Sequence, residues 1–243
     1  MMNRYALIAG AVVFIAGCNS SPPPLSAENT VGGASVVAFT QVPMATATTT
    51  LTLDWGAKGK AGQIAVADVL SYSGAKPKIS PPDGWKVIRD DSSKTTRQSL
   101  YWHAIQASDP TTATWTFSEP VNTKGAIVLL DNASTDSPVD MSSGSTDISG
   151  TLIAKSVVTT TDADLILLFY ATDFHIPGLN PKFPPVTTTV FDREGESHEY
   201  WVLATYQSQS GATDDVSVGE GQLFNWAAAQ VAIRRGGANP SSS

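Results

Sequence analysis

Apolar and polar residues alternate with a period of two in short stretches along this chain of 243 residues. In residues 48–55, Leu51 and Leu53 alternate with polar neighbours, which is typical of a strand with one buried face. Turn-forming clusters such as residues 80–84 separate this stretch from further predicted strands. Those strands cover residues 63–72, 99–105, 113–117, 126–131 and 164–171. Several short strands at regular spacing predict an all-β sandwich or barrel.

The second half of the chain repeats landmarks of the first half. An offset of 101 places residues 50–51 on residues 151–152, and residues 63–66 on residues 164–167. Three later landmarks recur at offsets of 103, 99 and 103, namely the proline pairs 81–82 and 184–185, the Tyr-Trp pairs 101–102 and 200–201, and the segments 122–129 and 225–232. Landmarks in the same order at nearly constant spacing predict an internal duplication.

We expect the two halves, residues 48–131 and 149–235, to form one domain over residues 35–235. The join at 132–147 is polar and loop-like, and neither half has enough long apolar strands to close comfortably alone. In a jelly roll, two related halves pack face to face over one core. The alanine-rich segment 226–232 has helical propensity, but its repeat counterpart favours a strand. The predicted fold is therefore a single all-β, jelly-roll-like sandwich, with a loose tail over 236–243.

The N-terminus has the layout of a secretory signal peptide. Arg4 gives a short basic start, residues 6–14 are apolar, and small residues precede Cys18, the one cysteine in the chain. The apolar stretch is shorter than the roughly 20 residues that span a bilayer. The segment 15–18, Ile-Ala-Gly-Cys, resembles the lipobox of bacterial lipoproteins. The resemblance implies that residues 1–17 are removed and that Cys18 is acylated.

The residues after Cys18 bear on the location and partners of the protein. Asn19 stands where the inner-membrane retention signal of such lipoproteins has an aspartate, so the resemblance favours the outer membrane, facing the periplasm or the cell exterior. Residues 18–34 are a linker in which 20–26, SSPPPLS, favour extended polyproline II. Without residues 1–17 the chain has 14 basic and 22 acidic side chains, a net charge of −8. This charge excludes nucleic acid as a partner and leaves the membrane, reached through the lipid anchor.

Four short motifs carry a second resemblance. They are residues 79–85 (ISPPDGW), 100–102 (LYW), 114–117 (TWTF) and 136–140 (DSPVD). With these motifs, residues 35–235 resemble a β-sandwich module of secreted bacterial proteins and of phage tail proteins. The resemblance implies an extracellular jelly-roll architecture and brings no catalytic residues. The second half departs from the pattern after its proline pair.

An acidic segment near residue 195 is the densest polar patch of the sequence. The spacing of Glu194, Glu196 and Glu199 loosely resembles the E-x-D-x-x-E strand of jelly-roll glucanases. Alternate strand residues lie about 6.5–7 Å apart, close to the separation of the two carboxyls of retaining glycosidases. Gly195 and His198, however, stand where apolar residues would bury the other face of such a strand. A solvated hairpin loop is the favoured interpretation, and a glycan-active hydrolase or lyase is the alternative.

Histidines and aspartates give no clear catalytic or metal motif. None of the three histidines has the sequence context of a hydrolase triad or a zinc protease. We expect His103 to be packed and hydrogen-bonded within its strand. Asp131, Asp136 and Asp140 offer oxygen ligands for calcium, but their spacing matches no EF-hand loop, so a turn-forming linker is favoured. We expect no metal and no cofactor.

Aromatic residues raise the question of glycan binding, because exposed rings are common platforms for sugars. We expect most tryptophans to fill the core, namely Trp85, Trp102, Trp115 and Trp201. Trp55 and Phe174 are expected to be more exposed. The predicted function is non-enzymatic binding of a glycan or of an envelope or surface protein, with a structural envelope or phage-derived surface protein as a further alternative. The ligand site is expected in loops at one end of the sandwich, at Trp55, Asp173, Phe174, His175, Glu194, Glu196 and His198.

Overall fold

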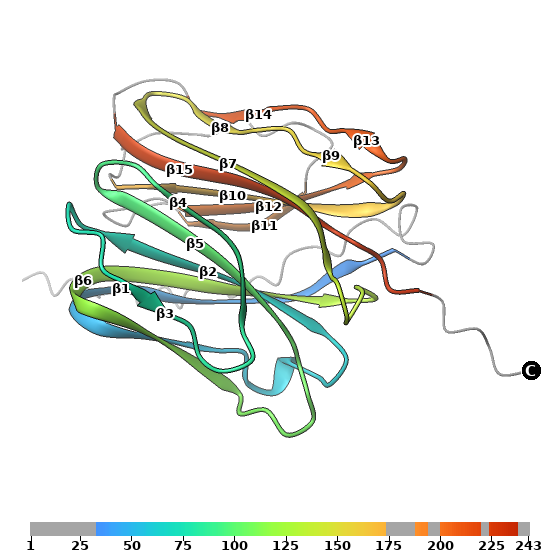
Figure 1. Ribbon diagram of the computed structural model, residues 1–243, viewed down its shortest axis with the longest axis horizontal. Coiled ribbons are helices and arrows are strands. Elements are labelled where there is room, and N and C mark those ends of the chain that lie inside the picture. Colours follow the sequence, from blue (N-terminus) through green and yellow to red (C-terminus); the bar gives the residue numbers. More distant parts are fainter. Residues whose placement is uncertain (1–32, 174–187, 194–199, 220–223, 238–243) are drawn as a thin grey trace, which may run out of the picture.

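The computed structural model of the protein describes residues 33–173, 188–193, 200–219 and 224–237. Within these residues the chain forms strands and a single three-residue 3-10 helix, Gly56–Lys58. Figure 1 shows two layers: the first half of the chain, blue to green, lies against the second half, yellow to red. The predicted all-β sandwich of two related halves is confirmed.

The first half of the chain supplies the whole of one antiparallel sheet. Its strand order is β1-β6-β2-β5-β4, and the short β3 pairs with β6 outside this path. The strands span β1 (Ser35–Asp54), β2 (Ile64–Tyr72), β3 (Ile79–Ser80), β4 (Lys86–Ser92), β5 (Thr96–Ala104) and β6 (Thr112–Asp131). Residues 113–117 and 126–131, expected as two strands, belong to the single long β6, and β1 begins well before residue 48.

The second half supplies the second sheet in the same strand order. The order β7-β15-β10-β12-β11 repeats β1-β6-β2-β5-β4 position by position. Its strands span β7 (Val139–Ser149), β10 (Asp164–Thr172), β11 (Thr188–Arg193), β12 (Tyr200–Gln207) and β15 (Phe224–Ile233). Two small pairs of strands accompany it: β8 (Leu152–Ala154) with β14 (Val216–Val218), and β9 (Val158–Thr159) with β13 (Gly211–Ala212).

The strand pairing fixes how the two halves correspond. Ile64 pairs with Leu130 in the first sheet, and Leu165 pairs with Ile233 in the second, so the offsets are 101 for β2 and 103 for β6. These are the offsets that the sequence predicted for the two segments. The Tyr-Trp landmark does not fit: Tyr101 pairs with Ala67, whereas Tyr200 pairs with Ala171. An offset of 99 would place the two tyrosines on opposite faces, so this landmark is wrong.

Each half has a core of its own in addition to the core between the sheets. In the first half, the end of β1 pairs with the start of β6 and packs Leu51 and Trp115 over the outer face of the sheet. In the second half, β8 and β14 place Leu152 and Val218 in the corresponding positions. The central strands β2 and β10 are therefore covered on both faces, and all nine residues of each are buried. This accounts for their nearly continuous apolar sequences.

The join between the halves contains a strand that the sequence did not predict. Residues 132–147 were expected to be a loop, but β7 begins at Val139 and pairs with β15. Its polar side chains have partners in the fold: the hydroxyls of Ser143 and Ser145 donate to the carbonyls of Lys155 and Ile153. A Ser-rich sequence therefore forms a strand because its hydroxyls bond to the backbone of a neighbouring segment.

Candidate functional site

The sandwich has two distinct ends. At the terminal end, defined by Ala34, Asp131 and Arg234, the first described strand begins where the last one ends. Ser35 pairs with Asp131, and the N–H of Gly236 donates to the carbonyl of Asn132. Figure 1 shows the start of β1 and the end of β15 on this side. The far end, defined by Tyr72, Thr95 and Asp173, lies at the other ends of β2 and β10.

Asp173 lies at the far end, in a hydrogen-bonded clasp between the two halves. Its carboxylate accepts hydrogen bonds from the hydroxyl of Thr95, from the backbone N–H of Asn225 at 3.0 Å and from the Asn225 side-chain amide at 2.8 Å. The hydroxyl of Thr96 donates to the Asn225 carbonyl at 3.2 Å. Thr95 and Thr96 belong to the first half and Asn225 to the second. The candidate carboxylate is thus engaged within the fold, and a ligand contact by Asp173 stays a prediction.

Trp55 does not have the exposure expected of it. It is 4% exposed because the alternation of β1 continues through residue 55 and places the ring on the buried face with Leu51 and Leu53. The remaining predicted site residues lie outside the described residues, namely Cys18, Phe174, His175, Glu194, Glu196 and His198.

Trp55 is one of several aromatic residues that pack under the outer ribbon of the first half. Trp85 lies 5.9 Å from Trp55 and 4.9 Å from Trp115 between ring centroids. His103 stacks on Trp85 at 5.3 Å. Its Nδ1 lies 3.1 Å from the carbonyl oxygen of Gly84, and its Nε2 lies 2.7 Å from Asp109 Oδ2. The expected hydrogen-bonded role of His103 is confirmed, and the contacts hold the turns at residues 84 and 109 against the strand.

The other predicted core tryptophans are placed as follows. Trp115 and Trp201 are completely buried, and Trp85 is 8% exposed. Trp102 is partly buried against the core between the sheets, with Lys86 Nζ 4.6 Å from its ring centroid. These four tryptophans therefore contribute mainly to the packing of the two halves.

A pair of acidic side chains at the terminal end has pKa values that are shifted in opposite directions. Asp164 is buried, and its burial, together with the neighbouring Asp140 carboxylate, raises the pKa of Asp164 to about 6. The pKa of Asp140 lies below its usual range. Burial acts to raise it, but hydrogen bonds from Thr160 and the charge of Arg234 outweigh that effect. Arg234 Nη2 lies 2.6 Å from Asp140 Oδ1. Sequence reasoning considered Asp140 only with Asp131 and Asp136, and it missed the pair because Asp164 lies 24 positions further along, at the start of an apolar strand.

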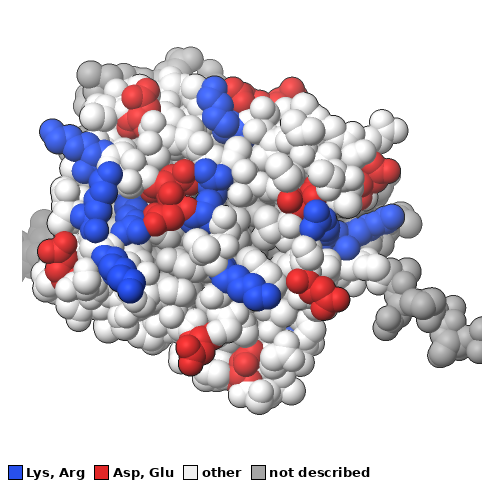
Figure 2. Space-filling model, viewed as in Figure 1, with Lys and Arg blue, Asp and Glu red and all other residues white. Residues whose placement is uncertain are grey.

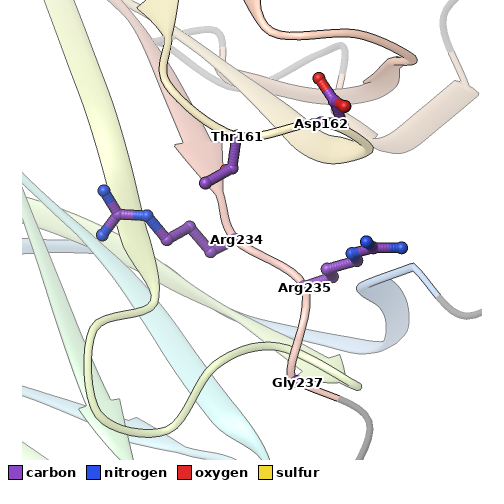
Figure 3. Close-up of a pocket in the computed structure, with 5 residues that line it drawn as sticks. All are labelled: Thr161, Asp162, Arg234, Arg235 and Gly237. Carbon is purple, nitrogen blue, oxygen red and sulfur yellow. The ribbon is translucent and has the colours of Figure 1, made fainter.

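A shallow cavity of about 280 Å³ lies beside this pair. Its lining residues are Thr161, Asp162, Arg234, Arg235 and Gly237. Figure 3 shows the two arginine side chains pointing away from each other, on opposite sides of the segment that carries them. Arg234 is used for ion pairing with Asp140 and for hydrogen bonds to Ser137. The cavity is slightly smaller than typical small-molecule pockets, which begin at about 300 Å³.

Charges on the visible face are mixed. Figure 2 shows acidic and basic side chains interspersed over it. Strand β4 takes part in two ion pairs, one between Arg89 and Asp91 and one between Asp90 and Arg97 of β5. Within the described residues, no group of three or more His, Cys, Asp or Glu side chains is placed to hold a metal ion. Asp131 accepts a hydrogen bond from Gln63 at 2.9 Å instead of joining Asp140.

Comparison with known proteins gives no relative for this chain. No protein family model matches it, and neither curated proteins nor solved structures give a significant match. The described part of the chain contains no helix with the length and hydropathy that a membrane crossing requires.

Proposed function

We propose that this protein is a bacterial lipoprotein of the outer membrane, anchored through Cys18, and that its sandwich is a non-enzymatic binding module for a glycan or for an envelope or surface protein. The lipobox-like segment 15–18 and the proline-rich spacer after it support the anchor. Several acyl chains together would hold the protein stably at a membrane.

The observation that carries the proposal is the position of the first described strand. Ala34 is completely buried, and its carbonyl accepts a hydrogen bond from Tyr206 at 2.8 Å, so the domain is joined to its linker at the terminal end. The 16 residues from Cys18 to Gly33 would span at most about 50 Å if they adopted polyproline II geometry. This geometry supports a domain whose terminal end is nearer the bilayer and whose far end is presented to partners.

The far end also offers exposed side chains for a binding surface. Lys76 lies in the loop that follows β2, and Lys94 lies in the turn between β4 and β5. Both are exposed, as are Lys58 and Lys60 in the loop between β1 and β2 near the terminal end. The two lysine pairs allow a comparison of the two ends with the same substitution.

The anchor is tested by the intact mass of the protein from membrane fractions, for the natural chain and for Cys18→Ser. We expect an acylated mature chain that begins at Cys18, and a variant that leaves the membrane fraction. An unmodified, freely soluble natural chain would overturn the anchor.

The binding role is tested on a glycan array with the soluble domain from Ala27 onward. We expect bound glycans, loss of binding in the double variant Lys76→Glu/Lys94→Glu, and retained binding in the control Lys58→Glu/Lys60→Glu. Equal loss in both variants would contradict binding at the far end. An array without bound glycans would exclude a glycan as the ligand and leave an envelope or surface protein as the partner.

A further inference from the structure

An acid and an amide lie together inside the core between the two sheets. Asp68 on β2 and Gln98 on β5 are completely buried and face the second sheet. Most residues around them in this core are apolar, including Leu70, Leu100 and Phe169. The completely buried Lys124 also faces this core, from the position on β6 that pairs with Leu70. An ionised carboxylate in such a place costs several kcal/mol unless it is fully hydrogen-bonded.

The hydrogen bonds of this pair are complete only if Asp68 carries a proton. Gln98 Nε2 donates to Asp68 Oδ2 at 2.7 Å. The two remaining oxygens, Asp68 Oδ1 and Gln98 Oε1, are both buried and have no hydrogen-bond partner among the described residues. Both are acceptors when Asp68 is ionised, so neither can satisfy the other. A proton on Oδ1 gives the acid one donor and one acceptor, which match the donor and acceptor of the amide.

We propose that Asp68 is held as a neutral acid, joined to the Gln98 amide by two hydrogen bonds, and that this proton makes the contact between the two sheets dependent on pH. The remaining polar groups that face this space are few. The side chain of Tyr200, from the second sheet, lies near Asp68, and Lys124 Nζ on β6 lies 5.9 Å from the Tyr200 ring centroid.

The electrostatics of these neighbours agree with a neutral acid. Burial is the largest influence and raises the pKa of Asp68 to about 8, although the hydrogen bond from Gln98 and the nearby Tyr200 hydroxyl oppose this rise. The charge of Asp91 on β4 raises it further, and Asp91 is itself paired with Arg89. Tyr72 also faces the core from β2. From β10 and β15 the residues in this core are apolar: Leu165, Leu167, Phe169, Ala171, Ala229, Val231 and Ile233.

The fold itself does not require an acid here. At the offset of 101, the counterpart of Asp68 in the second sheet is Phe169, which lies in the same core. Gln98 corresponds to Tyr200, because Gln98 pairs with Leu70 and Tyr200 pairs with Ala171. One half therefore fills these positions with aromatic residues and the other with a proton-dependent pair.

The direction of the pH effect follows from the proton. Between the ordinary pKa of 3.8 and about 8, the folded chain keeps the proton on Asp68 and the unfolded chain releases it. Stability therefore falls as pH rises in this range, by about ten-fold in the unfolding equilibrium constant per pH unit, and the fall ends above about pH 8.

The test is urea unfolding of the soluble domain between pH 6.5 and 9.5, for the natural chain and for Asp68→Asn. Asparagine keeps the two hydrogen bonds with Gln98 but has no proton to lose. We expect the unfolding equilibrium constant of the natural chain to rise about ten-fold between pH 6.5 and 7.5, and that of the variant to rise much less. The control is Asp90→Asn, an acid paired with Arg97 near the surface, which should keep the natural pH dependence. Equal pH dependence in Asp68→Asn and the natural chain would overturn the proposal.

A second measurement does not depend on a folded variant. The carboxyl-carbon chemical shift of Asp68, followed by NMR in the natural chain, reports its protonation directly. We expect the shift of a neutral acid at pH 6 and a transition several pH units above that of an ordinary aspartate. An ionised Asp68 at pH 6 would refute the proton on this pair.

Discussion

Replacement of Asp173 by alanine separates a structural role of this residue from a role in ligand binding. The substitution removes the acceptor of three hydrogen bonds, one from Thr95 in the first half and two from Asn225 in the second. Hydrogen bonds to a charged group contribute about 1.5–3 kcal/mol each, but the three share one carboxylate and water reaches part of the site. We therefore expect a total loss of about 2–3 kcal/mol in the free energy of unfolding.

The loss is measured by urea unfolding at pH 7, as a lower midpoint at an unchanged m value. For a domain of this size it corresponds to a fall of roughly 5–10 °C in Tm. A matched control is Asp83→Ala in the exposed turn before Trp85, which we expect to stay within about 0.5 kcal/mol of the natural chain. A change below about 0.5 kcal/mol in the free energy of unfolding of Asp173→Ala would refute the structural role of its hydrogen bonds between the two halves. Such a result combined with loss of a bound glycan would instead favour ligand contact.

Two further substitutions test other parts of the sandwich. Asp164→Asn removes the acid whose pKa is raised to about 6 beside Asp140. Because the folded chain holds that proton between about pH 4 and 6, the stability of the natural chain should fall as pH rises through this range. In urea unfolding, Asp164→Asn should show a weaker fall, and an unchanged fall would contradict a proton on this pair. Gly144→Ala places a methyl group against the ion pair of Arg89 and Asp91, which lies over Gly144. We expect the free energy of unfolding, measured by urea unfolding, to fall by about 1 kcal/mol as this partly buried pair is displaced. A variant as stable as the natural chain would show that the pair moves aside freely.

Several features of the fold were predictable because they depend on local pattern. The alternation of residues 48–55 marked the buried face of β1, and the apolar run of residues 63–72 marked β2. The repeat offsets of 101 and 103 were also correct, because they are set by the pairing of the central strands. These signals lie in strands whose side chains pack directly into a core.

Other features depend on contacts that no local pattern records. Strand β7 has a Ser-rich sequence, and only the backbone of residues 153–155 makes its hydroxyls compatible with a sheet. The engagement of Asp173 depends on Thr95, 78 positions away, and on Asn225, 52 positions away. The alternation of β1 places Trp55 on the buried face, but the ring packs against Trp85, 30 positions away in the sequence. Long-range partners, rather than residue types, decide the role of each of these residues.

The duplication makes some of these long-range contacts predictable after all. Gln63 and Asp131 are hydrogen-bonded across β2 and β6 at the terminal end. The offsets of 101 and 103 carry these positions to Asp164 and Arg234, which both approach Asp140 in the second half. Each half thus closes its terminal end with a polar contact between corresponding positions, although the chemistry changes from an amide and an acid to an acid pair with arginine. Where one half has a polar pair that the other lacks, as at Asp68, the duplication shows that packing does not require it, and a specific role for its proton becomes the question to test.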